Sequence, residues 1–84
     1  MIDEGDCVAI FHSIHRVMKA EKILKGRHPE ILLIPVPRQL SADCGMAIRF
    51  PGALLDAVAA TLQKSGLRIA EVWRMEAGEF QRLS

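Results

Sequence analysis

The order of its hydrophobic patterns is the feature that most constrains what this chain can fold into. Four short runs rich in β-branched and aromatic residues are typical of strands, at positions 7–13, 31–36, 46–50 and 67–75. Two segments with a helical period lie between the first and second runs and between the third and fourth. This order predicts an α+β fold, a ferredoxin-like β-α-β-β-α-β sandwich with two helices on one face of a four-stranded antiparallel sheet.

Local signals mark where these elements begin and end. The first helix is expected from Ile14, because Ser13 is a suitable N-cap and Gly26 a suitable stop. The second helix has an apolar face formed by Leu55, Val58, Ala59 and Leu62. Prolines in and after the second strand, Pro35 and Pro37, indicate an edge strand, since proline cannot donate to a neighbouring ladder. In the last strand, Glu71 interrupts the apolar alternation.

Size and charge restrict the classes of protein that remain. With 84 residues, half of them hydrophobic, and a net charge of +1, the chain is expected to form a single domain over 1–84, with a loosely ordered tail at 76–84. It lacks a basic stripe, an RNA-binding aromatic motif, a membrane-spanning run and a secretory pattern at its first residues, which predicts no nucleic-acid partner, no membrane partner and a cytoplasmic location.

The segment "IPVPRQLSADCG", residues 34–45, is the strongest candidate for a functional site. In the expected topology this loop lies at the sheet edge where the first helix begins, so Cys44 would be close to free backbone N–H groups. Arg38 could add positive charge, and Gly45 could let the backbone approach closely. Such surroundings lower the pKa of a thiol and make it reactive. An ordinary hairpin loop with a half-buried cysteine is an equally weighted alternative.

Other groups near this edge give weaker predictions. Arg49 is a second candidate for positive charge, and Asp43 would raise the pKa of the neighbouring thiol unless an arginine pairs with it. His12 and His15 could join Cys44 as nitrogen and sulfur ligands of a metal, but surface histidines are the favoured interpretation. Cys7 is expected at the far end of the first strand, too distant to form a disulfide with Cys44.

The loop and the helix before it resemble a known family. The blocks "FHSIHRVMKAEKIL" (11–24) and "LIPVPRQLSADCGMAIRF" (33–50) resemble the small bacterial family called putative Se/S carrier protein-like. The positions that match are Phe11, Ser13, Glu21, Ile34 through Arg38, Ser41, Cys44 and Gly45. The resemblance implies a sulfur or selenium carrier with its cargo on Cys44 and with Arg38, Ser41 and Gly45 supporting the loop.

Two functions follow as hypotheses. In the first, Cys44 accepts a persulfide or selenopersulfide from a donor such as a cysteine desulfurase or sulfurtransferase-like protein and relays it to an acceptor. The domain would then be an accessory carrier without a cofactor, rather than an independent enzyme, because it shows no paired carboxylates and no Ser-His-Asp set. In the second, the loop recognises a peptide or a small anion through Arg38 and backbone amides, as a non-catalytic interaction or ligand-sensing module.

Overall fold

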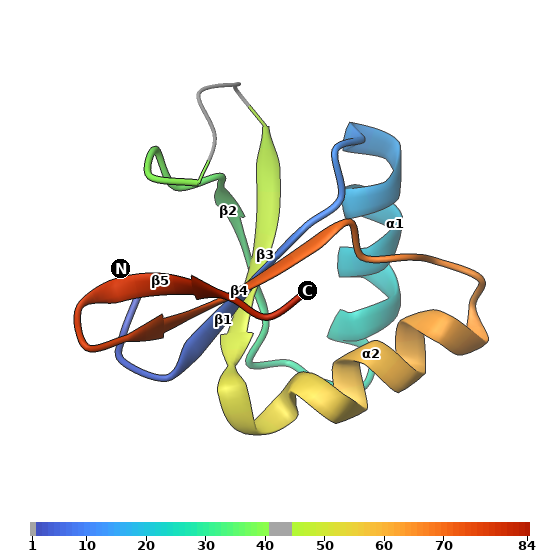
Figure 1. Cartoon of the computed structure of the whole chain (residues 1–84). Coiled ribbons are helices and arrows are strands. Elements are labelled where there is room, and N and C mark those ends of the chain that lie inside the picture. The colour runs from blue at the N-terminus through green and yellow to red at the C-terminus, as the bar shows by residue number, and fades with distance from the viewer. Residues whose placement is uncertain (1, 41–44) are drawn as a thin grey trace.

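The structure, a computed structural model, describes residues 2–40 and 45–84 and contains two α-helices and five strands (Figure 1). Its elements in chain order are β1 (Asp6–Ile10), α1 (Ile14–Lys25), β2 (Leu32–Pro35), β3 (Met46–Pro51), a 3₁₀ turn (Gly52–Leu54), α2 (Leu55–Lys64), β4 (Glu71–Glu76) and β5 (Glu79–Arg82). No helix in these ranges is long and apolar enough to cross a membrane.

All five strands form one antiparallel sheet in the order β2-β3-β1-β4-β5. The α+β class and the antiparallel sheet are therefore confirmed, and β2 is the edge strand that its prolines indicate. The prediction of four strands is wrong, because β5 pairs with β4 along the other edge. The specific ferredoxin-like assignment is not confirmed.

The main core lies between the sheet and the two helices, which pack on the same side of it (Figure 1). Alternate residues of β1 and β3 point toward the helices, and they include Cys7, Ala9, Ile48 and Phe50. The apolar stripes of the helices meet them, with Val17, Ala20 and Leu24 from α1 and Val58 and Leu62 from α2. A smaller cluster on the opposite, helix-free face contains Val8, Ile10 and Ala47.

The junction between β1 and α1 is longer than expected, because β1 ends early. The strand was predicted to run to residue 13, but it ends at Ile10, and His12 has a φ of +56° that no strand residue adopts. Ser13 is the N-cap of α1 as predicted, and its hydroxyl accepts a hydrogen bond of 3.3 Å from the Arg16 N–H. Gly26 follows as the C-cap. The positive φ at His12 turns the chain from the sheet into the helix.

The structure corrects the expectation of a loosely ordered tail over 76–84, because this segment contains β5. Ala77 and Gly78 have φ values of +53° and +77°, which matches a two-residue hairpin turn with both central residues in the left-handed region. The Glu4 carboxylate accepts hydrogen bonds from both of their N–H groups. Phe80 then packs against the cluster on the helix-free face. A single half-buried aromatic residue is a weak strand signal, which is why the sequence did not indicate this strand.

Candidate functional site

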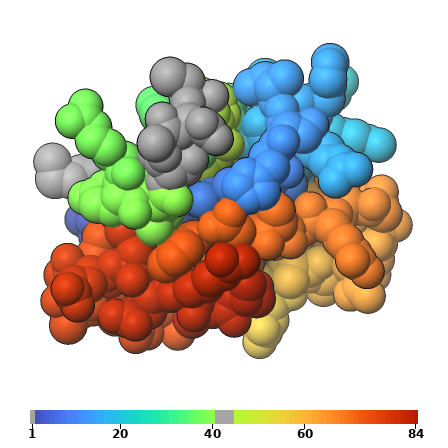
Figure 2. Space-filling model, turned by 45° about the horizontal axis from the view of Figure 1, so that its top comes forward, coloured from blue at the N-terminus to red at the C-terminus, as the bar shows by residue number. Residues whose placement is uncertain are grey.

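One end of the sheet gathers the segments that the sequence singled out. At this end Pro35 pairs with Met46, and Ile10 pairs both with Ala47 on β3 and with Glu71 on β4. The segment after β2, the start of β3, the junction after β1 and the start of β4 therefore share one edge. Figure 2 shows this end of the molecule from above, with the green segment before residue 41 and the blue start of α1 on the same face. We refer to it as the loop end of the sheet.

Both sides of the candidate loop are anchored to the sheet. The Val36 N–H donates to the Gly45 carbonyl at 2.9 Å, which continues the β2–β3 pairing by one more bond. Val36 and Leu40 pack against the apolar cluster of the helix-free face. The Leu40 N–H donates to the Pro37 carbonyl at 2.9 Å and closes a turn. The loop thus leaves and re-enters the sheet at defined positions.

Arg38 is exposed within this turn, between the two anchored residues Val36 and Leu40. Its guanidinium is accordingly available to an anionic group at the loop end. Cys44 and Ser41, the other two predicted residues of the loop, lie outside the described residues. Gly45 follows Cys44 directly, and a Cβ built on it would meet its nearest described neighbour, a Val36 methyl, at 3.7 Å. This is ordinary contact, so the expected close approach at Gly45 is not found among the described residues.

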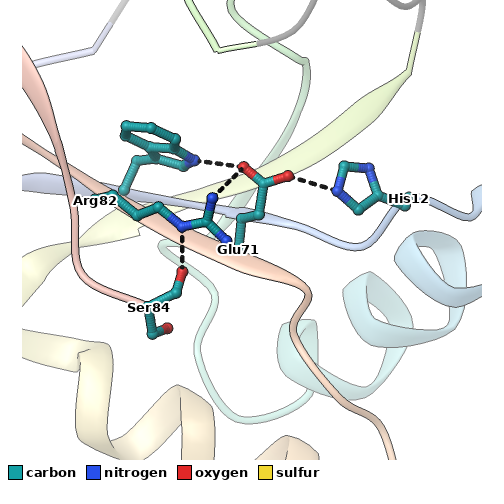
Figure 3. Close-up of polar contacts among 5 residues, drawn as sticks. His12, Glu71, Arg82 and Ser84 are labelled. Atoms are coloured by element: carbon teal, nitrogen blue, oxygen red, sulfur yellow. Dashed lines mark hydrogen bonds and ion pairs between the residues drawn. The ribbon is translucent and has the colours of Figure 1, made fainter.

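A cluster of polar side chains, missed as a site from the sequence, surrounds Glu71 at the loop end (Figure 3). His12 Nε2 lies 2.5 Å from Glu71 Oε2, and Trp73 Nε1–H donates to Glu71 Oε1 at 2.9 Å. Arg82 lies 3.9 Å from the same carboxylate, and its guanidinium is 5.7 Å from the centre of the Trp73 ring. The break in alternation at Glu71 was the available signal, but nothing in the sequence identified His12 as its partner.

These contacts determine the electrostatics of the cluster. The hydrogen bond from Trp73 lowers the pKa of the Glu71 carboxyl, and the hydrogen bond from His12 and the charges of His12 and Arg82 act in the same direction against desolvation. The Glu71 carboxylate orients the His12 ring, because it engages Nε2. Nδ1 is then left as the second ring nitrogen. The arrangement can therefore hold or pass a proton at the junction after β1.

The three-ligand metal site is not supported by the described residues. His12 contacts Glu71, whereas His15 is exposed on the first turn of α1. Within residues 2–40 and 45–84, no group of three His, Cys, Asp or Glu side chains is arranged to hold a metal ion. Cys44, the third proposed ligand, lies outside these ranges, so the hypothesis that includes it stays a prediction.

Arg49 does not supply positive charge to the loop end as expected. Its Nε donates to Asp6 Oδ2 at 2.8 Å, and its Nη2 lies 2.7 Å from the same oxygen and 3.3 Å from Asp3 Oδ2. The register places Arg49 opposite Val8, on the helix-free face in the middle of β3, and this explains the difference. Arg49 instead holds the N-terminal segment against the sheet.

Cys7 is a free thiol with no exposed surface, buried between the sheet and the helices. Burial raises the pKa of the Cys7 thiol, and this effect outweighs the lowering by the nearby Arg74 guanidinium. As predicted, Cys7 lies near the start of β1, at the end of the strand away from the loop end. A buried thiol of raised pKa is a poor nucleophile, so Cys7 is a core residue.

Comparison with known proteins now adds to this geometry. A family model described as putative Se/S carrier protein-like matches residues 6–74, from the start of β1 to the middle of β4. The chain belongs to this family. The match includes the loop and the start of α1, as the resemblance of these segments implied, and it leaves β5 and Arg82 outside. No curated protein and no solved structure matches the chain.

Proposed function

We propose that this protein carries sulfur or selenium as a persulfide or selenopersulfide on Cys44. The observation that carries the proposal is the register that holds Gly45, the residue after Cys44, at the sheet end where α1 begins. The first turn of a helix has unpaired N–H groups and a partial positive charge, which stabilise a nearby anion. Arg38 adds a full positive charge on the same loop. The family description supports the nature of the cargo.

The transfer needs only one cysteine on this chain. The Cys44 thiolate attacks the outer, sulfane sulfur of a donor cysteine persulfide. A new S–S bond forms on Cys44, the S–S bond of the donor breaks, and the donor cysteine leaves as a thiolate, so that no external oxidant or reductant is required. Transfer to an acceptor is the same reaction with the Cys44 persulfide as the donor: the acceptor thiolate attacks the outer sulfur, and Cys44 leaves as a thiolate. When selenium replaces the outer sulfur, the same bonds form and break, with an S–Se bond in place of the S–S bond.

Charge at the loop end favours both states of the carrier. The resting thiolate and the loaded persulfide are both anions, and Arg38 and the N-terminus of α1 stabilise each of them. His12, oriented by Glu71 at the loop end, can take up the thiol proton. The carrier then depends on donor and acceptor proteins for the remaining chemistry. We place it in the cytoplasm, where both thiols stay reduced, as a single ferredoxin-like domain extended by β5.

The test is to load the protein with sulfur and to measure its mass. The carrier is incubated with a cysteine desulfurase and cysteine, and its intact mass is measured without reductant. We expect a gain of one sulfur atom on the wild-type protein, with the label located on Cys44 by peptide mapping. Cys44→Ser should gain nothing, whereas Cys7→Ala should load like the wild type because Cys7 is buried.

Two results would contradict the proposal. One is an unchanged mass for the wild-type protein, and the other is an equal gain on Cys44→Ser. In either case the loop would be better explained as a ligand-recognition segment, with Arg38 as its anion contact. The desulfurase must be shown to be active with a known acceptor thiol in the same reaction.

A further inference from the structure

The outward face of α1 exposes two large apolar side chains. Val17, Ala20 and Leu24 face the core, whereas Ile14 and Met18 are 56% and 47% exposed. They are four residues apart, so they are neighbours on one row of the helix surface. Among the described residues only Leu32 and Leu83 are comparably exposed large hydrophobics. Two neighbouring exposed apolar side chains on a helix form a candidate contact surface when other features of the same face point to a partner.

Basic residues border this pair, and the fold does not use most of them. The helix contains Arg16, Lys19, Lys22 and Lys25 but only one acidic residue. Lys25 has a structural role, because its Nζ donates to the Ile31 carbonyl at 2.7 Å and to the Pro29 carbonyl at 3.3 Å. The ion pairs found among residues 2–40 and 45–84 include none of the other three.

The position of Lys22 completes the surface. It follows Met18 by four residues and therefore extends the row that begins at Ile14, and Lys19, three residues before Lys22, is the neighbour of Lys22 on the helix surface. The exposed face thus has an apolar pair with Lys19 and Lys22 on one border, while Glu21, three residues after Met18, lies on the other. Protein interfaces have this composition when an apolar contact supplies affinity and charges at the rim select the partner.

The location of the face fits a partner that exchanges cargo at the loop. The start of α1 lies at the loop end of the sheet (Figure 2). Its first residue is Ile14, directly after His12 and Ser13. A donor protein must bring its own cysteine to this end, so it has to contact the surface next to it. The start of α1 is the described helical surface that adjoins the loop end.

We propose that the face formed by Ile14, Met18, Lys19 and Lys22 docks an acidic, partly apolar surface on the protein that delivers sulfur to Cys44. This inference rests on the proposed carrier function. Positive charge on the carrier requires negative charge on the donor surface, and the exposed apolar pair requires an apolar patch at its centre. The contact is small and polar at its rim, which suits a transient complex.

The test measures docking separately from transfer. Cys44→Ser protein, which cannot accept sulfur, is titrated with a cysteine desulfurase at low salt by calorimetry. We expect binding that weakens as salt increases, because the charges are exposed. Lys19→Glu combined with Lys22→Glu, and separately Met18→Gln, should each raise the Kd about tenfold. The matched control is Lys64→Glu combined with Arg68→Glu, which makes the same charge change at exposed positions outside α1 and should bind normally.

Loading with glutathione persulfide separates the two proposals, because a small donor needs no docking surface. The α1 variants, now with Cys44 intact, should load normally from glutathione persulfide and slowly from the desulfurase. If they bind and load from the desulfurase like the wild type, or if Cys44→Ser protein does not bind it, the docking proposal is wrong. If neither donor loads Cys44, the carrier function fails, while weaker binding of the α1 variants would still support the docking face.

Discussion

His12 Nε2 lies 2.5 Å from Glu71 Oε2, so the junction after β1 is tied to the first residue of β4. The other carboxylate oxygen accepts from Trp73, which leaves both oxygens of Glu71 engaged. His12 also has a positive φ, an unusual conformation for a residue with a side chain. The contact with Glu71 therefore fixes the direction of a ring whose backbone is itself constrained, at the same end of the sheet as the candidate loop.

The lowered pKa of Glu71 predicts a specific dependence of stability on pH. Because this pKa is lower in the folded protein than the ordinary value of 4.5, the stabilisation is fully present above pH 4.5 and is lost as the pH falls through the lowered value. Glu71→Gln should reduce the free energy of unfolding by about 1 kcal/mol at pH 7 and should weaken its decline in acid. Urea unfolding between pH 7 and pH 3 measures both. Glu79→Gln, at an exposed position on β5, is the control and should follow the wild type.

The burial of Cys7 predicts that it resists modification in the folded protein. A thiol with no exposed surface and a raised pKa is both inaccessible and poorly ionised. Cys44→Ser protein, in which Cys7 is the remaining thiol, should therefore take up no iodoacetamide at pH 8 until it is unfolded in urea. Intact mass gives the extent of alkylation. Rapid labelling of the native variant would show that β1 opens readily and would invalidate mass-based loading experiments on the wild type.

Much of the fold could be predicted because its signals are local. The Ser13 cap of α1 and the prolines of β2 are each contained in a few neighbouring residues, and each has the expected role. The fifth strand could not be predicted in this way. Its turn uses Ala77 in a left-handed conformation, which is uncommon for alanine and is supported by the Glu4 carboxylate, 73 residues away. Only the folded chain brings these groups together.

The candidate site was likewise predictable where its signals are local and unpredictable where it depends on contacts between distant residues. The loop was recognisable from its composition, and its position follows from strand order alone. The role of Arg49 depended on which face of β3 it occupies and on the acidic residues of the N-terminal segment, and the sequence indicated neither. The pairing of His12 with Glu71 is likewise a contact across the sheet end between residues far apart in the chain.

The two arginines near the loop and the sheet centre should have separable effects. Arg49→Met removes a guanidinium that bonds the largely buried Asp6, so the free energy of unfolding should fall by about 2 kcal/mol. Arg38→Met, at an exposed turn position, should leave stability within about 0.5 kcal/mol but slow the alkylation of Cys44 at pH 7. Urea unfolding and the alkylation rate give the two measurements. The expectation fails if Arg49→Met slows the thiol reaction and Arg38→Met does not.

Gly52 predicts a steric requirement at the far end of the sheet. A Cβ on this residue would lie 2.2 Å from the Gly5 carbonyl oxygen, which is backbone and cannot move aside as a flexible side chain could. Gly5 is itself held by a hydrogen bond of 2.7 Å from its N–H to the Met75 carbonyl. Gly52→Ala should therefore destabilise the protein by about 2 kcal/mol or more. Gly45→Ala, whose new Cβ would lie 3.7 Å from its nearest described neighbour, should be nearly neutral in the same urea titration.

The strand that the sequence did not indicate can be tested through Phe80. Its side chain packs on the cluster of the helix-free face, opposite Met75 in the register, whereas Gln81 is exposed on the other side of β5. Phe80→Ala should lower the free energy of unfolding by about 1–2 kcal/mol, less than for a fully buried phenylalanine, and Gln81→Ala should be nearly neutral. Hydrogen exchange should show protection of amides in β5 in the wild type and its loss in Phe80→Ala. If both substitutions are neutral and β5 exchanges at the rate of an unfolded peptide, residues 79–82 are a loose tail, and Arg82 cannot support Glu71 as described.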